Sequence, residues 1–316
     1  MILSVSPNVA LDRVVVVDGF APGRQSRARL GFWQAGGSGC HASSVIQELG
    51  VQTVALGFIG GHTGALWQKA AAESGLQHDM ILTDRETRVS FCIVDENLGS
   101  VVESVETGPD LDPSHREELL ERVARYLPEA SLLILSGSLP PGLSVDTYAA
   151  LIRMSRAYGV HTLIDAHSQP LREALTQTPW LVKLNLDEFQ HWLGRPAVTL
   201  EERAAASLEM TAQHTEALVL SMAGEGVLLT VGEEQWHLLP PAIDVHLPHG
   251  AGINVIGSGD ALVGAMAATY RGGATLLEAV QVGLAAAHVN LGSYGVPEVD
   301  ATAVHEAAGQ VIARRL

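Results

Sequence analysis

The sequence contains few cysteines, no long uncharged apolar run and few basic residues, and each of these absences excludes a class of protein. Only two of the 316 residues are cysteines, Cys40 and Cys92, which allow neither a disulfide framework nor a zinc-ligand spacing. No run of eighteen uncharged apolar residues is present, so we expect no membrane span. Met1–Arg13 lacks a basic region followed by a long apolar stretch, which argues against a secretory signal. These absences predict a cytoplasmic protein without a membrane partner.

Basic residues are also scarce, with 19 Lys and Arg against 35 Asp and Glu and a formal net charge of −16 at pH 7. Binding to nucleic acid depends mainly on Lys and Arg at the phosphates, so this charge disfavours a nucleic-acid partner. A phosphorylated small molecule can still bind if a few cations are concentrated around it. Hydrophobic residues make up 47% of the chain, enough for one large core. The sequence shows no linker-like, repeated or low-complexity stretch, so we expect a single domain over residues 1–316.

Helix-like and strand-like stretches alternate from residue 113 onward at a spacing of about thirty residues. This alternation is typical of a mostly parallel sheet with helices on both faces. The expected strands are 2–6, 54–59, 132–135, 161–164, 181–184, 217–220 and 227–231, and the expected helices are 66–74, 113–126, 145–158, 170–176 and 200–214. Strands near 8–33 and 87–105 are expected to form a small β lid. Ligands bind at the carboxyl ends of the strands in such sheets, so the loops that follow the strands are candidate site segments.

The stretch Pro248–Gly264 joins a glycine-rich loop to a helix. Its loop glycines tolerate positive φ angles, and they are Gly250, Gly252, Gly257 and Gly259. Apolar residues then recur at helical spacing, so the loop opens onto a helix N-terminus, which attracts phosphate oxygens. Asp260 at this terminus is either a helix cap or a base beside a bound anion. A second glycine-rich loop, residues 34–39, precedes another helical stretch that ends at Gly50.

Short motifs follow successive strands in a fixed order. They are Asp12, G-G-S-G at 36–39, S-G-S-L-P-P-G at 136–142, N-x-x-E at 185–188, S-x-x-G-x-G at 221–226 and G-S-G-D at 257–260. Each motif alone is weak, but their joint order resembles the ribokinase-like PfkB family of carbohydrate kinases over nearly the whole chain. The opening S-P-N-V-A-L-D is similar to the 1-phosphofructokinase and tagatose-6-phosphate kinase branch. The resemblance implies an α/β fold, a ribokinase-like three-layer α/β/α sandwich with a mostly parallel central sheet and a small β lid.

The resemblance also implies ATP and Mg²⁺ as cofactors, with roles for particular residues. Asp260 would be the base for a sugar hydroxyl, and the N–H groups of Gly257, Ser258 and Gly259 would form an anion hole. Asn185 and Glu188 would hold Mg²⁺ through water, although their spacing alone also fits a helix cap. The residues implied at the nucleotide are Lys183, Asn185, Ser221, Gly224, Gly226 and Asn290. Asn290 also fits the last residue of a helix, and Leu184 stands where the family usually has Pro.

On the sugar side, the resemblance implies that Asp12 binds hydroxyls and that Arg88 binds a phosphate. The full implied set is Asp12, Gly36, Gly37, Ser38, His41, Arg88, Arg27 and Ser138. The alternatives are a turn residue for Asp12 and solvent-exposed side chains for the two arginines.

Two positions depart from the branch, whose usual loop is G-G-K-G-x-N. Ser38 replaces the Lys and His41 replaces the Asn. His41 could substitute as a donor, and its ordinary pKa near 6.5 predicts that it loses its charge between about pH 6 and 8. An ordinary helix histidine is the alternative.

These departures leave three hypotheses. The first is ATP-dependent transfer to a phosphorylated ketohexose: fructose 1-phosphate, fructose 6-phosphate or tagatose 6-phosphate. The second is transfer to an unphosphorylated sugar or a nucleoside. The third is a non-catalytic sensor of sugars or nucleotides. The family would also suggest a homodimer formed through the lid.

Overall fold

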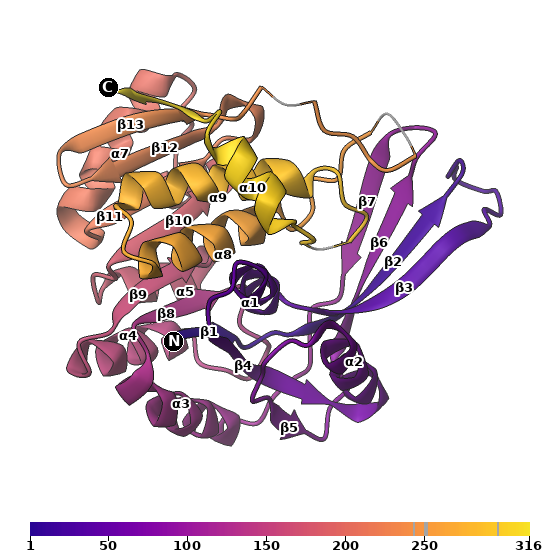
Figure 1. Ribbon diagram of the computed structural model, residues 1–316. Coiled ribbons are helices and arrows are strands. Elements are labelled where there is room, and N and C mark those ends of the chain that lie inside the picture. The colour runs from indigo at the N-terminus through magenta and orange to yellow at the C-terminus, as the bar shows by residue number, and fades with distance from the viewer. Residues whose placement is uncertain (243, 250–251, 296) are drawn as a thin grey trace.

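The computed structural model describes residues 1–242, 244–249, 252–295 and 297–316. Its largest element is a ten-stranded sheet with the strand order β14-β13-β12-β11-β10-β9-β8-β1-β4-β5 (Figure 1). Neighbouring strands from β11 to β5 in that order are parallel to each other. The pairs β11–β12, β12–β13 and β13–β14 are antiparallel. The strands are β1 (Ile2–Ser6), β4 (Thr53–Gly60), β5 (Ile81–Thr83), β8 (Leu132–Ser136), β9 (His161–Asp165), β10 (Leu181–Asn185), β11 (Ala217–Ser221), β12 (Val227–Val231), β13 (Glu234–Leu239) and β14 (Ile312–Arg315).

The parallel strands are buried on both faces because helices cover both. In β8, Leu133 and Leu135 pack in one core while Leu132 and Ile134 pack in the other, as expected for side chains that alternate along a strand. Helices α3 to α7 contribute to the first core, and α1, α8, α9 and α10 contribute to the second. The expected three-layer α/β/α arrangement is therefore confirmed.

Ten α-helices lie within the residues that the structure describes. Their bounds are α1 (Ser38–Glu48), α2 (Gly61–Ser74), α3 (Ser114–Tyr126), α4 (Thr147–Ala157), α5 (Ser168–Leu175), α6 (Leu186–Leu193), α7 (Leu200–His214), α8 (Ser258–Arg271), α9 (Leu276–Asn290) and α10 (Ala301–Ala308). Helices α1 and α8 pack closely, since a Cβ added at Gly264 would lie 2.5 Å from the carbonyl oxygen of Ala42. In the described part of the chain, no helix has the length and apolar character needed to cross a membrane.

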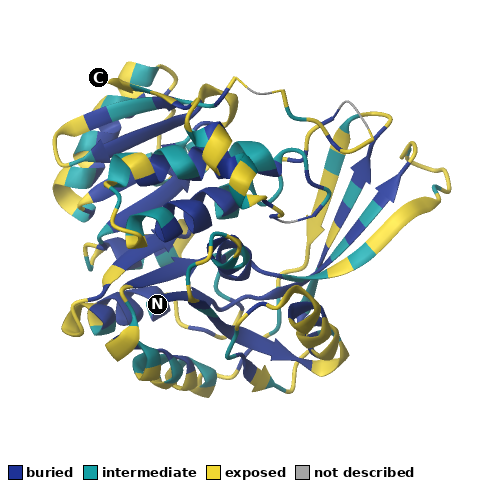
Figure 2. Ribbon diagram, in the orientation of Figure 1, coloured by how far each residue is buried: buried dark blue, intermediate teal, exposed yellow. Residues whose placement is uncertain are grey.

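A second sheet of four strands, the lid, projects to one side of the large sheet (Figure 1). Its order is β3-β2-β6-β7, with β2 (Ala10–Val17), β3 (Ala28–Gly36), β6 (Arg88–Asp95) and β7 (Ser100–Val105). Along the central lid strands β2 and β6, buried residues alternate with less buried ones, whereas β3 and β7 are mostly exposed (Figure 2). Val14, Val16, Cys92 and Val94 form the buried face with Leu247. The lid thus carries Asp12, which lies on the same face as Val14, toward the edge of the large sheet.

One segment of the lid differs from the sequence-based expectation. Residues 34–36 are not part of a loop but the end of β3, because Gly36 pairs with Ala10 on β2. The loop is consequently reduced to Gly37, which has a φ of 111° and precedes α1 directly. That positive φ favours glycine, so the turn into α1 depends on this residue.

Candidate active site

The predicted site segments meet at the carboxyl edge of the large sheet. Ser136 at the end of β8 lies beside Asp165 at the end of β9. Asn185 at the end of β10 lies beside Ser221 at the end of β11. Parallel strands bring these ends together by their direction alone. The amino end of α8 reaches the same region, because Lys183 of β10 contacts the turn at Gly259.

The turn into α8 carries the motif Gly257–Asp260. Gly257 precedes the helix with a φ of 75°, and no side chain caps the helix. Asp260 therefore does not act as the cap, which was one of its two interpretations. The first N–H groups of a helix have no partner within it, so this terminus can receive an anion. Gly250, which belonged to the same predicted loop, lies outside the described residues.

Asp260 instead contacts His41, which also contacts Asp12. Nδ1 of His41 lies 2.9 Å from Oδ2 of Asp260, and Nε2 lies 2.8 Å from Oδ2 of Asp12. The three side chains are 16%, 11% and 7% exposed for Asp260, His41 and Asp12. Burial alone would lower the pKa of His41, but the hydrogen bonds and charges of the two carboxylates raise it to about 10. The expectation that His41 loses its charge between pH 6 and 8 was therefore wrong.

Glycine at position 36 is required by this arrangement. A Cβ added at Gly36 would lie 2.0 Å from Oδ2 of Asp12. The carboxylate consequently lies directly over the Gly36 backbone, where any side chain would collide with it. Ser38 begins α1, and its hydroxyl lies near Gly137, since a Cβ there would be 3.5 Å from Ser38 Oγ. The amino end of α1 and the loop after β8, residues 136–142, are thus neighbours.

The two arginines occupy different positions. Arg88 begins β6 beside Ala10 and donates hydrogen bonds to the backbone carbonyls of Asn8, at 2.8 and 3.1 Å, and Glu106, at 3.1 Å. Burial lowers the pKa of Arg88, and nearby carboxylates, first Asp12, oppose this. Arg27 precedes β3 and is exposed, whereas Asp12 lies opposite Gln34 at the other end of that strand pair. Ala28, the neighbour of Arg27, is six residues from Gln34 along β3, so more than about 20 Å of strand separates Arg27 from Asp12.

Asn8 links several of these groups, although the sequence analysis gave it no role. Its Nδ2 donates to the hydroxyl of Ser138 at 2.9 Å and to the carbonyl of Thr107 at 2.9 Å. Its backbone carbonyl accepts from Arg88. Asn8 thus connects the predicted sugar-side residues Ser138 and Arg88. The signals for Asn8 in the sequence were the break after β1 and its place in the opening motif S-P-N-V-A-L-D.

On the nucleotide side, Lys183 and Asp165 form a buried ion pair with an Nζ–Oδ1 distance of 3.1 Å. Burial lowers the pKa of Lys183, but the carboxylates of Asp165, Glu188 and Asp260 raise it more. Lys183 Nζ also lies close to Gly259: a Cβ added at Gly259 would be 2.9 Å from it. A positive charge is thus held against the Gly257–Asp260 turn. Asp165 holds it there; it lies in one of the candidate loops that follow the strands, although no role was predicted for its side chain.

Asn185 and Glu188 form a complete capping box at the start of α6. The Glu188 N–H donates to Asn185 Oδ1 at 2.9 Å, and the Asn185 N–H donates to Glu188 Oε2 at 2.8 Å. No group of three His, Cys, Asp or Glu side chains that could hold a metal occurs within the described residues. The second oxygen of Glu188 remains for a water of a hydrated Mg²⁺, so this oxygen-donor pair fits outer-shell binding.

The other residues that the resemblance implies at the nucleotide lie at turns, at a strand end or in the protein interior. Gly226 has a φ of 90°, and a Cβ there would lie 2.0 Å from the carbonyl oxygen of Leu238, so the turn before β12 requires glycine. Gly224 has open space around its α-carbon. Ser221 donates to the carbonyl of Leu184 at 3.4 Å. The Asn290 side chain is fully buried and hydrogen-bonded to the turn before α8.

The sequence also matches a known protein family. The model of the pfkB family of carbohydrate kinases matches residues 8–302. The chain belongs to this family. The PfkB kinase is 29% identical over 280 residues to the 1-phosphofructokinase of Xanthomonas campestris pv. campestris, covering 87% of this chain and 86% of that protein. It is 28% identical over 270 residues to the tagatose-6-phosphate kinase of Staphylococcus epidermidis, covering 84% of each.

Solved structures share the fold of this PfkB kinase. A protein of Thermotoga maritima described as a possible 1-phosphofructokinase superposes with a TM-score of 0.90 at 23% identity, covering 100% of this chain and 99% of that one. Phosphofructokinase-2 of Escherichia coli, in complex with potassium, gives a TM-score of 0.86 at 23% identity and covers 98% of each chain. The ribokinase-like fold implied by the motifs is thereby confirmed.

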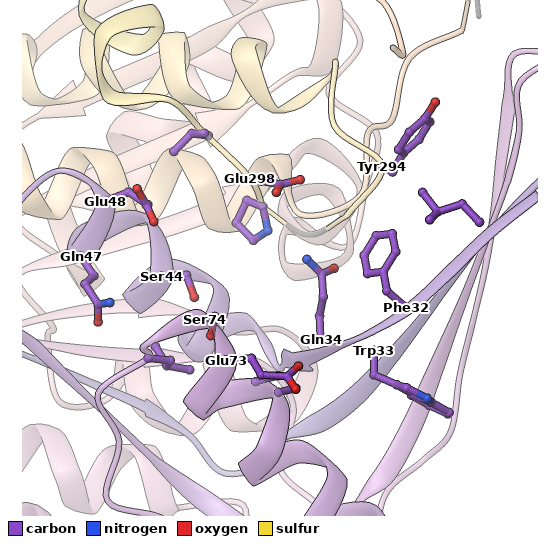
Figure 3. Close-up of a pocket in the computed structure, with 16 residues that line it drawn as sticks. Phe32, Trp33, Gln34, Ser44, Gln47, Glu48, Glu73, Ser74, Tyr294 and Glu298 are labelled. Carbon is purple, nitrogen blue, oxygen red and sulfur yellow. The ribbon is translucent and has the colours of Figure 1, made fainter. Parts of the chain in front are cut away.

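A cavity of about 750 Å³ lies apart from the predicted site residues of the kinase (Figure 3). It is bounded by β3, α1, α2 and the segment after α9. Phe32 and Gln34 of β3 face Glu48 of α1 and Glu73 of α2 across it, and Tyr294 and Glu298 form part of its wall. None of the residues implied by the motifs lines this cavity.

Proposed function

We propose that this PfkB kinase transfers the γ-phosphoryl group of ATP to a hydroxyl of a phosphorylated ketohexose. The observation that carries the proposal is the position of the Asp260 carboxylate, in the first turn of α8 and joined through His41 to Asp12. A base for the acceptor, a hydroxyl-binding carboxylate and an anion-binding helix terminus are the parts that phosphoryl transfer requires. The relatives named 1-phosphofructokinase and tagatose-6-phosphate kinase support fructose 1-phosphate, fructose 6-phosphate or tagatose 6-phosphate as the acceptor.

In this mechanism, Asp260 accepts the proton of the acceptor hydroxyl as its oxygen forms a bond to the γ-phosphorus. The bond between that phosphorus and the bridging oxygen of ADP breaks, so one phosphate ester forms and ADP leaves. The N–H groups of Gly257, Ser258 and Gly259 stabilise the charge on the transferred group, and the Lys183 ammonium adds to their field. Asn185 and Glu188 would hold hydrated Mg²⁺, which supplies charge neutralisation of the phosphates when bound.

The acceptor phosphate would be bound near Arg88. Arg88 is held at the base of the lid by Asn8, and Asp12 lies on the neighbouring strand β2. Arg27 is not part of this proposal, because it lies at the far end of the lid. Ser38 leaves the loop without the Lys of related loops, so an unphosphorylated sugar or a nucleoside is the second candidate acceptor. A sensor without catalytic activity is disfavoured by the base at position 260, which a binding protein would not need.

An ADP-release assay over a small panel tests these candidates. The panel contains fructose 1-phosphate, fructose 6-phosphate, tagatose 6-phosphate, fructose and adenosine. We expect turnover with at least one phosphorylated ketohexose, and we expect Asp260→Asn to lower kcat on the order of 10²–10⁴-fold while ATP affinity is kept. Asp84→Asn, at an exposed position, is the matched control. Faster turnover of fructose or adenosine than of the phosphorylated ketohexoses would favour the second candidate acceptor. No turnover of any compound would favour the non-catalytic sensor.

We also propose that two copies associate through the lid. The exposed face of the lid carries Trp33, Phe91 and Val102, which are 39%, 45% and 47% exposed. Arg13 lies over the Trp33 ring at 4.9 Å on the same face. Light scattering of the protein and of Phe91→Glu tests this, and a monomeric wild-type protein would contradict it.

A further inference from the structure

We propose that His41 is a positioning residue that joins Asp260 to Asp12 and presents one free oxygen of each carboxylate to two hydroxyls of the same acceptor. This inference rests on the proposed function. It goes beyond the expectation that His41 is a hydrogen-bond donor on the sugar side. It concerns three residues that lie far apart in the sequence, on β2, α1 and α8. His41 is separated from Asp12 by 29 positions and from Asp260 by 219.

The first argument is the geometry of the contacts. Nδ1 and Nε2 are on opposite edges of the imidazole ring, so the two carboxylates lie on opposite sides of it. Both contacts, at 2.9 and 2.8 Å, use the Oδ2 atom of the aspartate. Among the described residues, Oδ1 of Asp12 and Oδ1 of Asp260 have no hydrogen-bond partner. Each carboxylate therefore retains an acceptor atom for a ligand while His41 stays in place.

The second argument is charge. Asp12 from β2, Asp260 from α8 and Glu103 from β7 all interact with His41. Arg88 of β6 faces Asp12 and Glu103, and Lys183 of β10 faces Asp260. A protonated imidazole can donate to both carboxylates at once, which a neutral imidazole cannot do. The ring therefore acts as a charged connector between carboxylates that would otherwise repel each other.

The third argument is that the asparagine found in related loops could not replace this connection. Its side chain carries its two donor hydrogens on one nitrogen and has no positive charge. Asn at position 41 would thus bind one carboxylate well and leave the other free to rotate. The acceptor hydroxyl would then meet a base whose orientation is not fixed, and misplacement by about 1 Å can cost about 100-fold in rate.

The alternative is that His41 only fills the acceptor position in the free enzyme and must leave before the acceptor binds. The two roles predict opposite kinetics. If His41 positions Asp260, His41→Asn lowers kcat about 100-fold and changes the KM for ATP little. If His41 blocks the position, His41→Ala lowers the acceptor KM and raises kcat/KM. The second result would overturn the proposal.

The decisive experiment combines kinetics with nuclear magnetic resonance of the His41 ring. Wild type, His41→Asn, His41→Ala and the exposed control His62→Asn are compared over about pH 4 to 9, with the panel of phosphorylated ketohexoses. We expect the acidic limb of the pH–activity profile to lie about one pH unit higher in His41→Asn than in wild type, because the substitution removes a cation beside the base. Imidazole added to His41→Ala should restore part of kcat without lowering KM. A pH profile of His41→Asn that coincides with wild type would contradict the inference.

The nuclear magnetic resonance measurement does not depend on substrate. In the wild-type protein both ring nitrogens of His41 should remain protonated from about pH 6 to 9, and in Asp12→Asn they should titrate at lower pH. If no acceptor is turned over, the proposed function fails, but the ring signals still test the connection. If turnover is found and the ring titrates near pH 6.5, the connection fails and the proposed function stands.

Discussion

The side-chain amide of Asn290 donates a hydrogen bond of 2.9 Å to the backbone carbonyl of Ile256. The same amide donates to the hydroxyl of Ser258 at 3.1 Å, so the last residue of α9 holds both sides of Gly257. Its Oδ1 accepts from the hydroxyl of Ser293 at 3.1 Å. The conformation of the turn that carries Asp260 is therefore set from the interior, by a helix that follows it in the chain.

Asn290→Asp keeps the size of the side chain and removes the donor. We expect a loss of about 1–3 kcal/mol in the free energy of unfolding, because the buried carbonyl of Ile256 loses its partner. We also expect kcat to fall about tenfold or more, since the anion-binding turn is no longer fixed. Chemical denaturation and the ADP-release assay measure the two effects. Asn97→Asp, at an exposed position of the lid turn, is the control, and equal effects in the two variants would contradict the prediction.

Glu188→Gln separates the capping role of this residue from a role in metal binding. Glutamine can complete the capping box, so thermal stability should change little, while the lost charge should raise the Mg²⁺ concentration needed for half-maximal activity several-fold. Glu202→Gln changes the equivalent residue in the capping box of α7 and provides a matched control. An equal shift in both variants, or full activity of the wild-type protein in excess EDTA, would exclude the proposed role.

Arg88→Ala should raise the KM for a phosphorylated ketohexose about ten- to a hundredfold. A charge-assisted hydrogen bond to a phosphate is worth about 1.5–3 kcal/mol, which corresponds to this range. The KM for ATP should change little. Arg88 also joins β6 to Asn8, so the melting temperature of the variant must be compared with that of Arg85→Ala, which alters an exposed arginine three residues earlier. Unchanged phosphosugar kinetics would remove Arg88 from the acceptor site.

The stability of the protein should depend on pH through His41. Its pKa is about 10 in the folded protein and 6.5 as the ordinary value, so the folded state binds the proton more tightly. The resulting stabilisation is complete below pH 6.5, decreases as pH rises and is lost above about 10. Chemical denaturation of the wild type and His41→Asn at about pH 6, 8 and 10 should show a shrinking difference in the free energy of unfolding. A constant difference would indicate that His41 is neutral throughout.

Much of the fold could be predicted from local pattern. The strand at 132–135 is a continuous apolar run, as expected for a strand buried on both faces, and it is present as β8. Other elements carried weaker signals. Helix α6 begins directly after β10 and contains only eight residues, and β5 contains three. Strand β14 is mostly exposed and is held by its pairing with β13, which no local pattern encodes.

The site could be predicted as a set of residues but not as a set of contacts. The resemblance carried by the order of the motifs predicted that Asp12 and Asp260 belong to one site, and the two carboxylates share a hydrogen-bond partner in the structure. Their common partner His41 was predicted as a donor on the sugar side, but its contacts with the two carboxylates were not, because sequence does not give the distance between side chains. The pKa expected for His41 was wrong for the same reason, since the actual pKa depends on the two carboxylates. Asn8 belongs to the opening motif S-P-N-V-A-L-D, but its contacts with Ser138 and Arg88 could not be predicted from that motif.

The close packing of α1 against α8 affects how this protein is made. During synthesis, Ala42, Val45 and Ile46 leave the ribosome more than two hundred residues before the helix that covers them. They are fully buried only in the complete protein. For that period α1 presents apolar surface that chaperones or other nascent chains can bind. A chain truncated before Ser258 would lack both the cover for α1 and the turn that holds Asp260, so fragments of this kinase should aggregate rather than retain partial activity.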